Sequence, residues 1–333
     1  MLQAVVEPET AGDPMSDQKW ARSSLRQLSR RLVAAGHPAS PPTVGRLLDD
    51  LGYALHVNAK KLEASAARPG RNAQFEYIAE QRRAFTLAGL PQISVDTKKK
   101  ELIGNFRNGG RTWSQAAEAV NVHDFRQDAL GRAVPYGIYD LTHNRGTVYL
   151  GTSADTPRFA VDALTCWWAS EGRAAFPGAE RLLVLADAGG SNNCRSRVWK
   201  RQLQEQLCDR FGLTVTVCHY PTGCSKWNPV EHRLFGPISV NWAGKPLRTW
   251  EAIQAAVRGT STITGLEVRA ELYDRPYRTG ERVTDAEMAN LRLEHHALCP
   301  AWNYTLRPRQ TRIAATPTPA PGRSARRVLS SPL

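Results

Sequence analysis

The stretch "RLLVLAD", residues 181–187, is a nearly continuous run of apolar residues that ends in an aspartate. A strand that helices cover on both faces has this composition, because both of its side-chain rows are buried. We therefore expect residues 181–187 to form the central strand of a sheet. Asp187 would then lie at the carboxyl end of that strand, where ligands gather in open α/β sheets.

The segments on either side extend this sheet. In chain order they are the strand "PQISVD" (91–96), the hairpin strands "AVPYGIYDL" (133–141) and "GTVYLGTS" (146–153), a helix at about 156–172, the central strand, a helix at about 195–211, the strand "LTVTVCHY" (213–220) and a helix from about Asn228. Alternating β-branched and aromatic residues around the turn "THNRG" indicate the hairpin. This order predicts an α/β fold with a ribonuclease-H-like mixed sheet flanked by helices.

Two short amphipathic stretches precede this region, "SSLRQLSRRLVAAG" (23–36) and "SPPTVGRLLDDLGY" (40–53). Two such helices joined by a short break predict a helix-turn-helix-like unit, in which Arg46 is a candidate DNA contact. A helical pair that packs on the next domain is the alternative. The expected organisation is a poorly ordered lead (1–19), a helix-turn-helix-like DNA-binding unit (20–63), a catalytic domain (64–242), a small α+β extension (243–306) and a disordered basic tail (307–333).

The composition is that of a globular protein with excess positive charge. The 333 residues include 44 Lys and Arg against 31 Asp and Glu, a net charge of +13, and 41% are hydrophobic. Such an excess favours a polyanionic partner, and we expect double-stranded DNA. No apolar run approaches the ~18 residues of a membrane helix, and the first residues do not resemble a signal peptide. We expect a cytoplasmic protein that associates with DNA and not with membranes.

Three carboxylates occupy strand and helix ends: Asp96 ends its strand, Asp187 ends the central strand, and Glu231 opens the helix in "VCHYPTGCSKWNPVEHRLFG" (217–236). Converging in one crevice, they would repel each other unless divalent cations neutralised them. Mg²⁺ prefers carboxylates with phosphate oxygens and water, and two such ions can clamp an in-line phosphoryl displacement. The pattern predicts that these three acids are catalytic and hold two Mg²⁺ ions, for which Mn²⁺ can substitute.

Each acid also has a purely structural interpretation. Asp96 can begin the turn "DTKKKE", and Asp187 can be a turn residue before "AGGSNN". Glu231 can cap its helix, since Asn228, Pro229 and Glu231 suit the N-cap, N1 and N3 positions. The joint placement of the three acids favours the metal site.

Four more residues beside these acids are candidate DNA contacts. Lys98, Lys99 and Lys100 could bind phosphates, and a solvated turn is the alternative. Trp227 could stack on an unpaired base, and packing in the core is the alternative.

Several motifs together resemble a known family: "ISVDTKKKELIGNF", "VNVHDF", "PYGIYD", "LADAGGSN", "CHYPTGCSKWNPVEHRLF", "NWAGKPL", "TGLEVRAEL" and "WNYTL". They are similar to the bacterial insertion-sequence transposases of the ISAzo-thirteen type, which are DDE transposases with a ribonuclease-H-like catalytic domain. The resemblance runs from about residue 6 to residue 306. It implies that Asp96, Asp187 and Glu231 are the metal-binding triad.

Two departures from the family pattern stand out. Ala188 occurs where the family usually reads "ADGGGSN", and members resemble this chain only after a further N-terminal stretch. The predicted function is metal-dependent DNA strand cleavage and strand transfer of an insertion sequence by a homo-oligomer on DNA. The alternatives are a non-catalytic DNA-binding remnant of a truncated transposase and a ribonuclease-H-fold nuclease.

Overall fold

The computed structural model describes residues 10–12, 19–21, 24–53 and 70–309. The chain divides into two compact units, residues 1–67 and 68–333. Within the described ranges, no helix has the length and apolar character needed to cross a membrane.

The first unit contains a short hairpin and two helices. Strands β1 (Thr10–Gly12) and β2 (Lys19–Ala21) pair antiparallel, so part of the lead that was expected to be poorly ordered forms a hairpin. Helices α2 (Leu25–Ala34) and α3 (Pro41–Asp50) each begin at a serine whose hydroxyl accepts a hydrogen bond from the backbone of the first turn. They pack through three buried residues, Leu28, Leu32 and Val44. Residues 54–63 of the predicted unit lie outside the described residues.

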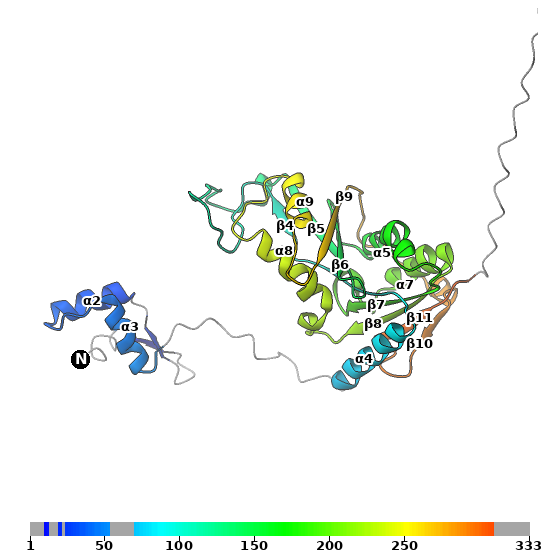
Figure 1. Cartoon of the computed structure of the whole chain (residues 1–333), viewed down its shortest axis with the longest axis horizontal. Coiled ribbons are helices and arrows are strands. Elements are labelled where there is room, and N and C mark those ends of the chain that lie inside the picture. Colours follow the sequence, from blue (N-terminus) through cyan, green and yellow to red (C-terminus); the bar gives the residue numbers. More distant parts are fainter. Residues whose placement is uncertain (1–9, 13–18, 22–23, 54–69, 310–333) are drawn as a thin grey trace, which may run out of the picture. The chain divides into compact units, whose positions relative to one another are not determined.

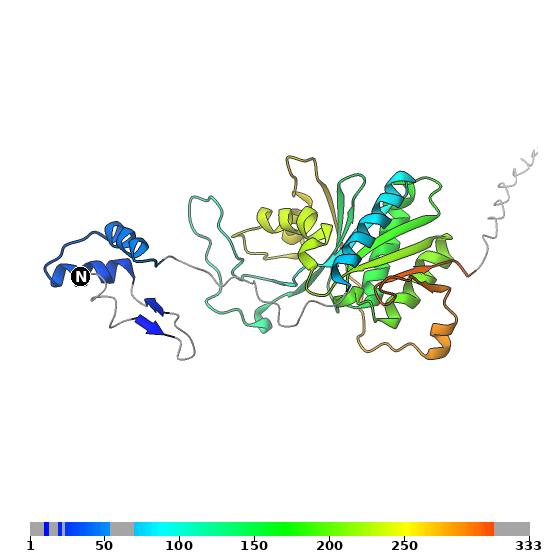
Figure 2. The same ribbon diagram turned by 90° about the horizontal axis from the view of Figure 1, so that it is seen from below.

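The second unit is built on one mixed sheet, which Figure 1 and Figure 2 show from two directions. Its strands are β3 (Gln92–Thr97), β4 (Glu101–Ile103), β5 (Gly131–Asp140), β6 (Arg145–Gly151), β7 (Arg181–Asp187), β8 (Thr214–Tyr220), β9 (Glu267–Tyr273), β10 (Leu293–His295) and β11 (Asn303–Leu306). The order is β10-β11-β8-β7-β3-β5-β6-β9, with β4 paired to β5. β3, β7 and β8 run parallel, and β5 is antiparallel to β3. The predicted ribonuclease-H-like mixed sheet is confirmed.

Helices cover both faces of this sheet, which is why β7 is apolar almost throughout. Helices α5 (Pro157–Trp167) and α7 (Arg197–Leu203) pack on one face around buried residues of the central strands. Helix α5 runs on through a wide turn (Trp168–Gly172) into α6 (Arg173–Ala175), and α7 runs on through a similar turn (Gln204–Asp209).

The opposite face carries α4 (Arg71–Leu87), the helical segment Glu231–Phe235 with α8 (Gly236–Asn241), and α9 (Trp250–Arg258). The segment after β8 therefore packs directly on the sheet. Because this segment is packed against the sheet, the first turn of its helix has a fixed position relative to the strand ends.

The segment predicted as a separate α+β extension completes both edges of the same sheet. β9 pairs parallel with β6, and β11 pairs antiparallel with β8. The short helix α10 (Asp285–Ala289) lies between them in sequence and opens with the predicted capping box of Thr284 and Glu287. The sequence indicated strands here, but the partner strands are more than 80 residues away in the chain, and local patterns do not specify such pairing.

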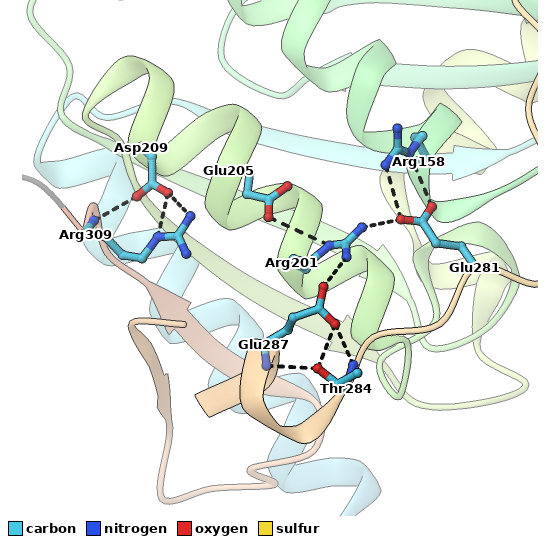
Figure 3. Close-up of polar contacts among 8 residues, drawn as sticks. All are labelled: Arg158, Arg201, Glu205, Asp209, Glu281, Thr284, Glu287 and Arg309. Carbon is cyan, nitrogen blue, oxygen red and sulfur yellow. Dashed lines mark hydrogen bonds and ion pairs between the residues drawn. The ribbon is translucent and has the colours of Figure 1, made fainter. Parts of the chain in front are cut away.

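Arginine–carboxylate pairs fasten this segment to α7, as Figure 3 shows. Arg201 of α7 binds the carboxylates of both Glu281 and Glu287. Asp209 binds Arg309, whose guanidinium lies 2.7 Å away. Residues 307–309, which were predicted to belong to a disordered tail, thus include an anchored arginine; the rest of that tail lies outside the described residues.

Candidate active site

The parallel pairing of β3 and β7 brings two of the predicted acids together. Val95 pairs with Ala186 in the register of the two strands, and the next residue on each strand is an acid. Asp96 and Asp187 therefore lie at the carboxyl ends of adjacent strands. Asp96 accepts a hydrogen bond from the backbone N–H of Thr97 at 2.7 Å. Both carboxylates therefore lie at the same end of the sheet, where these two parallel strands terminate.

Glu231 reaches this end from the other direction. A loop follows β8, a short 3-10 turn spans Ser225–Trp227, and the helix then begins just before Glu231. The carboxyl of Glu231 lies close enough to that of Asp96 for each to affect the pKa of the other. Val230, the residue at the N-cap of the segment Glu231–Phe235, has no side-chain capping hydrogen bond, and none of the hydrogen bonds of the described residues joins the Glu231 carboxyl to the backbone. Glu231 thus faces another carboxyl and does not cap its own helix.

Burial and mutual repulsion make these carboxyls hard to ionise. Burial, and next the charge of Asp187, raise the pKa of Asp96 to about 8. Burial raises the pKa of Asp187 to about 6, against the opposing hydrogen bond from Asn228. The pKa of Glu231 is raised by burial, although its contact with Asp96 and the charge of Lys98 act against this. None of the described ion pairs within 4.0 Å includes any of the three acids.

This donor set suits a hard divalent cation. Carboxylate oxygens are the ligands that Mg²⁺ prefers, and a partly buried acid cluster without its own cation is stabilised either by protonation or by a cation from outside. In the described ranges, no three His, Cys, Asp or Glu side chains are gathered tightly enough to hold an ion as they stand. The residues fit Mg²⁺ by the chemistry of their oxygen donors.

A shell of buried polar residues supports the acids, and the sequence did not reveal it. Asn228 was interpreted as a helix N-cap, but its side-chain amide donates to the carboxylate of Asp187 and to the backbone carbonyl of Val95, each at 3.2 Å. The hydroxyl of Ser94 accepts from the backbone N–H of Val230 at 2.9 Å. A serine from the neighbouring strand therefore satisfies the start of this helix, and Asn228 is free to bind Asp187.

His219 supports Asp187 from the β8 side. Its Nδ1 lies 2.9 Å from the backbone carbonyl of Asp187, so Nδ1 carries the proton and donates. Its Nε2 accepts from the hydroxyl of Tyr304, which itself accepts from the indole N–H of Trp199. Burial lowers the pKa of His219 to about 4, so the imidazole is neutral. Both ring nitrogens are thus committed to structural bonds.

Asp155 is a fourth acid near this end of the sheet, and the sequence analysis did not select it. Its carboxylate accepts from the hydroxyl of Thr97 at 3.1 Å and pairs with Lys100 at 3.0 Å. Because Asp155 has a lysine partner, it differs from the three acids that have none. The only sequence signal for it was its place shortly after a strand.

Nearly the whole chain matches a known protein family. The family model described as the Rhodopirellula transposase DDE domain matches residues 1–308. The chain belongs to this family. This confirms both the resemblance drawn from the sequence motifs and the predicted transposase function. A comparison with curated proteins found no match.

Among solved structures, the transposase is similar to a Mos1 transposase paired-end complex with left transposon end, with a TM-score of 0.40 and 13% identity over 76% of this chain and 67% of that chain. It is also similar to a mariner Mos1 paired end complex with Mg, with a TM-score of 0.42 and 12% identity over 76% of this chain and 67% of that chain.

The predicted DNA contacts of the transposase have different surroundings. The ammonium of Lys98 lies 3.3 Å from Glu101 and 4.6 Å from the centre of the Trp242 ring, and Lys100 binds Asp155. Lys99 is exposed between them. Of the three lysines, Lys99 presents its charge most openly to solvent.

Trp227 and Arg46 both lie at the surface. The Trp227 side chain is 55% exposed, with an edge-on contact to Phe75 and the ammonium of Lys226 over its ring, so it is not a core residue. Arg46 is exposed on α3 and lines a shallow hollow with Asp49 and Asp50. Those two acids reduce the positive potential at that face of α3.

Proposed function

We propose that Asp96, Asp187 and Glu231 hold two Mg²⁺ ions, or Mn²⁺ in their place, and that the transposase uses this site to cut its transposon ends and join them to target DNA. The observation that supports this most strongly is the end of the sheet where three partly buried carboxyls meet with no ion-paired lysine or arginine among the described contacts. Isolated charges of one sign are costly inside a protein, and such clusters mark functional sites.

Bound divalent ions supply Lewis-acid activation of the attacking hydroxyl and neutralise charge on the leaving oxygen. The chain's own residues position this chemistry. Asp96 and Asp187 present oxygens from two adjacent parallel strands, and Glu231 closes the site from the helix that follows β8. Because the pKa of Asp96 and that of Glu231 are both raised, these carboxyls must lose their protons before both can act as ligands. Water attacks in the cleavage step, and a 3′-hydroxyl attacks in the joining step.

Duplex DNA is the partner that this site requires, and the surface offers candidate contacts for it. We assign phosphate binding to Lys99 and base stacking to Trp227, both of which are exposed. Lys98 and Lys100 would contribute mainly through their field, since each has a carboxylate partner. The α2–α3 pair with Arg46 would hold DNA by phosphate contacts, with log K falling by about 0.9 per contacted phosphate as log salt rises.

Cutting both ends of one element calls for more than one catalytic site, so we expect a homo-oligomer on DNA, acting in the cytoplasm. The alternatives make different predictions. A ribonuclease-H-fold nuclease would cut without joining, and a DNA-binding remnant would do neither.

The test is cleavage and joining of a labelled transposon-end duplex with Mg²⁺. Glu231→Gln keeps the size of the side chain and removes its charge, so strand cleavage should collapse while DNA binding and folding persist. Glu287→Gln is the matched control. Glu287 caps helix α10 and pairs with Arg201, and it is not one of the three site acids. Near-normal cleavage by Glu231→Gln would remove Glu231 from the proposed site.

A further inference from the structure

One side chain contacts both acid-bearing strands and begins the segment that carries the third acid. Asn228 is fully buried, and its Nδ2 donates to the Val95 carbonyl beside Asp96 and to Oδ1 of Asp187, each at 3.2 Å. Its own backbone carbonyl accepts from the N–H of Glu231 at 3.0 Å.

The orientation of this amide is fixed by its neighbours. The Val95 carbonyl can only accept, so the group that faces it must be the NH₂ and not the oxygen. The amide oxygen then accepts from the hydroxyl of Ser94, which is also fully buried. Ser94 in turn accepts from the N–H of Val230 at 2.9 Å. Each donor and acceptor of the Asn228 side chain is therefore used, and a rotation of the amide would break three hydrogen bonds.

This arrangement leaves one oxygen of the Asp187 carboxylate available to bind a cation. Asn228 holds Oδ1, whereas Oδ2 has no hydrogen bond among the described contacts. An amide can hold a carboxylate in this way without adding charge, and a lysine or arginine would neutralise it instead. Residues that orient metal ligands typically change metal affinity or activity by about 10–100-fold when mutated.

We propose that Asn228 is a positioning residue that orients the Asp187 carboxylate toward the divalent cation and aligns Glu231 with it. This inference rests on the proposed function, since it assumes that Asp187 is a metal ligand. Asn228 acts through Asp187 and not on DNA. Its loss should therefore weaken metal binding and leave affinity for DNA unchanged.

The experiment compares Asn228→Ser with Asn303→Ser. Asn303 is also fully buried and hydrogen-bonded through its amide, but its partners are Gln74 and the carbonyl of Leu298. Both variants lose a buried amide, and only Asn228→Ser loses a bond to a site acid. Two quantities are measured: Mn²⁺ binding to the DNA-free protein by calorimetry, and the Mg²⁺ concentration that gives half-maximal cleavage.

We expect Asn228→Ser to weaken Mn²⁺ binding and to raise the half-saturating Mg²⁺ concentration by about 10-fold or more. Asn303→Ser should leave both quantities within about two-fold, and both variants should keep the wild-type affinity for DNA. If Asn228→Ser does not fold, Asn228→Asp has the same shape and replaces the donor by a repelling acceptor, so it should show the same weakening. Unchanged metal dependence in whichever folded variant is measured would overturn the proposal.

Asp187→Asn separates the two possible failures. If Asp187→Asn still cuts with normal metal dependence, the proposed metal site is wrong. If Asp187→Asn is inactive and Asn228→Ser behaves like wild type, the site stands and the positioning role of Asn228 does not.

Discussion

Carboxylates gather in two regions of this transposase, and the two regions treat them in opposite ways. Along α7, Glu281 and Glu287 bind Arg201, and Asp209 binds Arg309, in the network of Figure 3. The pKa of Glu287 is lowered there, first by its capping hydrogen bonds to Thr284 and also by Arg201.

At the carboxyl ends of β3 and β7 the situation is reversed. The pKa of Asp96 rises to about 8 and that of Asp187 to about 6, because burial outweighs the few stabilising hydrogen bonds. A carboxylate that only holds the fold together has its counter-charge within the chain. A buried cluster that lacks one stores a cost that an external cation can relieve. On this comparison we propose that the acids at the strand ends are functional, whereas those along α7 are structural.

Asp96→Asn should give the largest effect. Removing a carboxylate that would hold the metal should lower strand cleavage by roughly 10³-fold or more. Folding should not suffer, because the substitution removes a buried charge that repels its neighbours. The measurement is cleavage of a transposon-end duplex at matched concentrations of folded protein. Cleavage within ten-fold of wild type would place Asp96 among the structural acids.

The free energy of unfolding should also depend on pH through Asp96 when metal is absent. The pKa of Asp96 in the folded chain is about 8, against an ordinary value of 3.8. The folded state thus binds the proton more tightly, so this contribution to stability is fully present below pH 3.8 and is lost as pH rises through about 8. In EDTA, wild type should be on the order of 1–3 kcal/mol less stable than Asp96→Asn at pH 8.5 and nearly equal to it near pH 4.

Thermal unfolding of both proteins across this pH range measures that difference, and excess Mg²⁺ should shrink it. A constant difference between the two proteins at all pH values would contradict the raised pKa.

Gly137→Ala should disturb the site through packing alone. A β-carbon at Gly137 of β5 would lie 2.6 Å from Cζ of Phe235 and 3.2 Å from Cδ2 of Leu234, on the segment that begins with Glu231. Overpacking of this kind costs about 1–3 kcal/mol, and the displaced helix should weaken cleavage as well. Chemical denaturation together with the cleavage assay tests this. A variant of normal stability and activity would mean that the packing of this helix does not set the position of Glu231.

Glu287→Gln should give the smallest effect. The side chain of Glu287 is 41% exposed, and glutamine can keep much of its capping hydrogen bonding, so only the pairing with Arg201 weakens. We expect a slight fall in melting temperature and unchanged cleavage. A large loss of activity would show that the α7 network affects the site, and the contrast between the two regions would lose its meaning.

The sequence predicted the central features because they depend on local patterns. The apolar run ending at Asp187 identified the central strand, and strand and helix ends located the three acids. Asn228 was misinterpreted because Asn-Pro at a helix start looks the same whether the amide caps the helix or reaches another strand. The structure shows that Ser94 of β3 accepts from the helix start instead.

Non-local pairing explains the remaining differences. β9 and β11 have ordinary alternating sequences, so nothing local assigns them to opposite edges of one sheet. The ion pair of Lys100 likewise depends on how the chain folds, because its partner Asp155 lies in another segment. Exposure of Trp227 follows from the packing of its loop beside α4, which composition does not reveal.

The most direct test of the metal site is the binding of Mn²⁺ to the DNA-free transposase, measured by electron paramagnetic resonance. Wild type and Glu287→Gln should bind Mn²⁺ alike, because the carboxylates of the α7 network are already paired with arginine side chains. Asp187→Asn should lose most of that binding at pH 8 while remaining folded by circular dichroism. Equal Mn²⁺ binding by Asp187→Asn and wild type would show that the unpaired acids at the strand ends do not hold the ion.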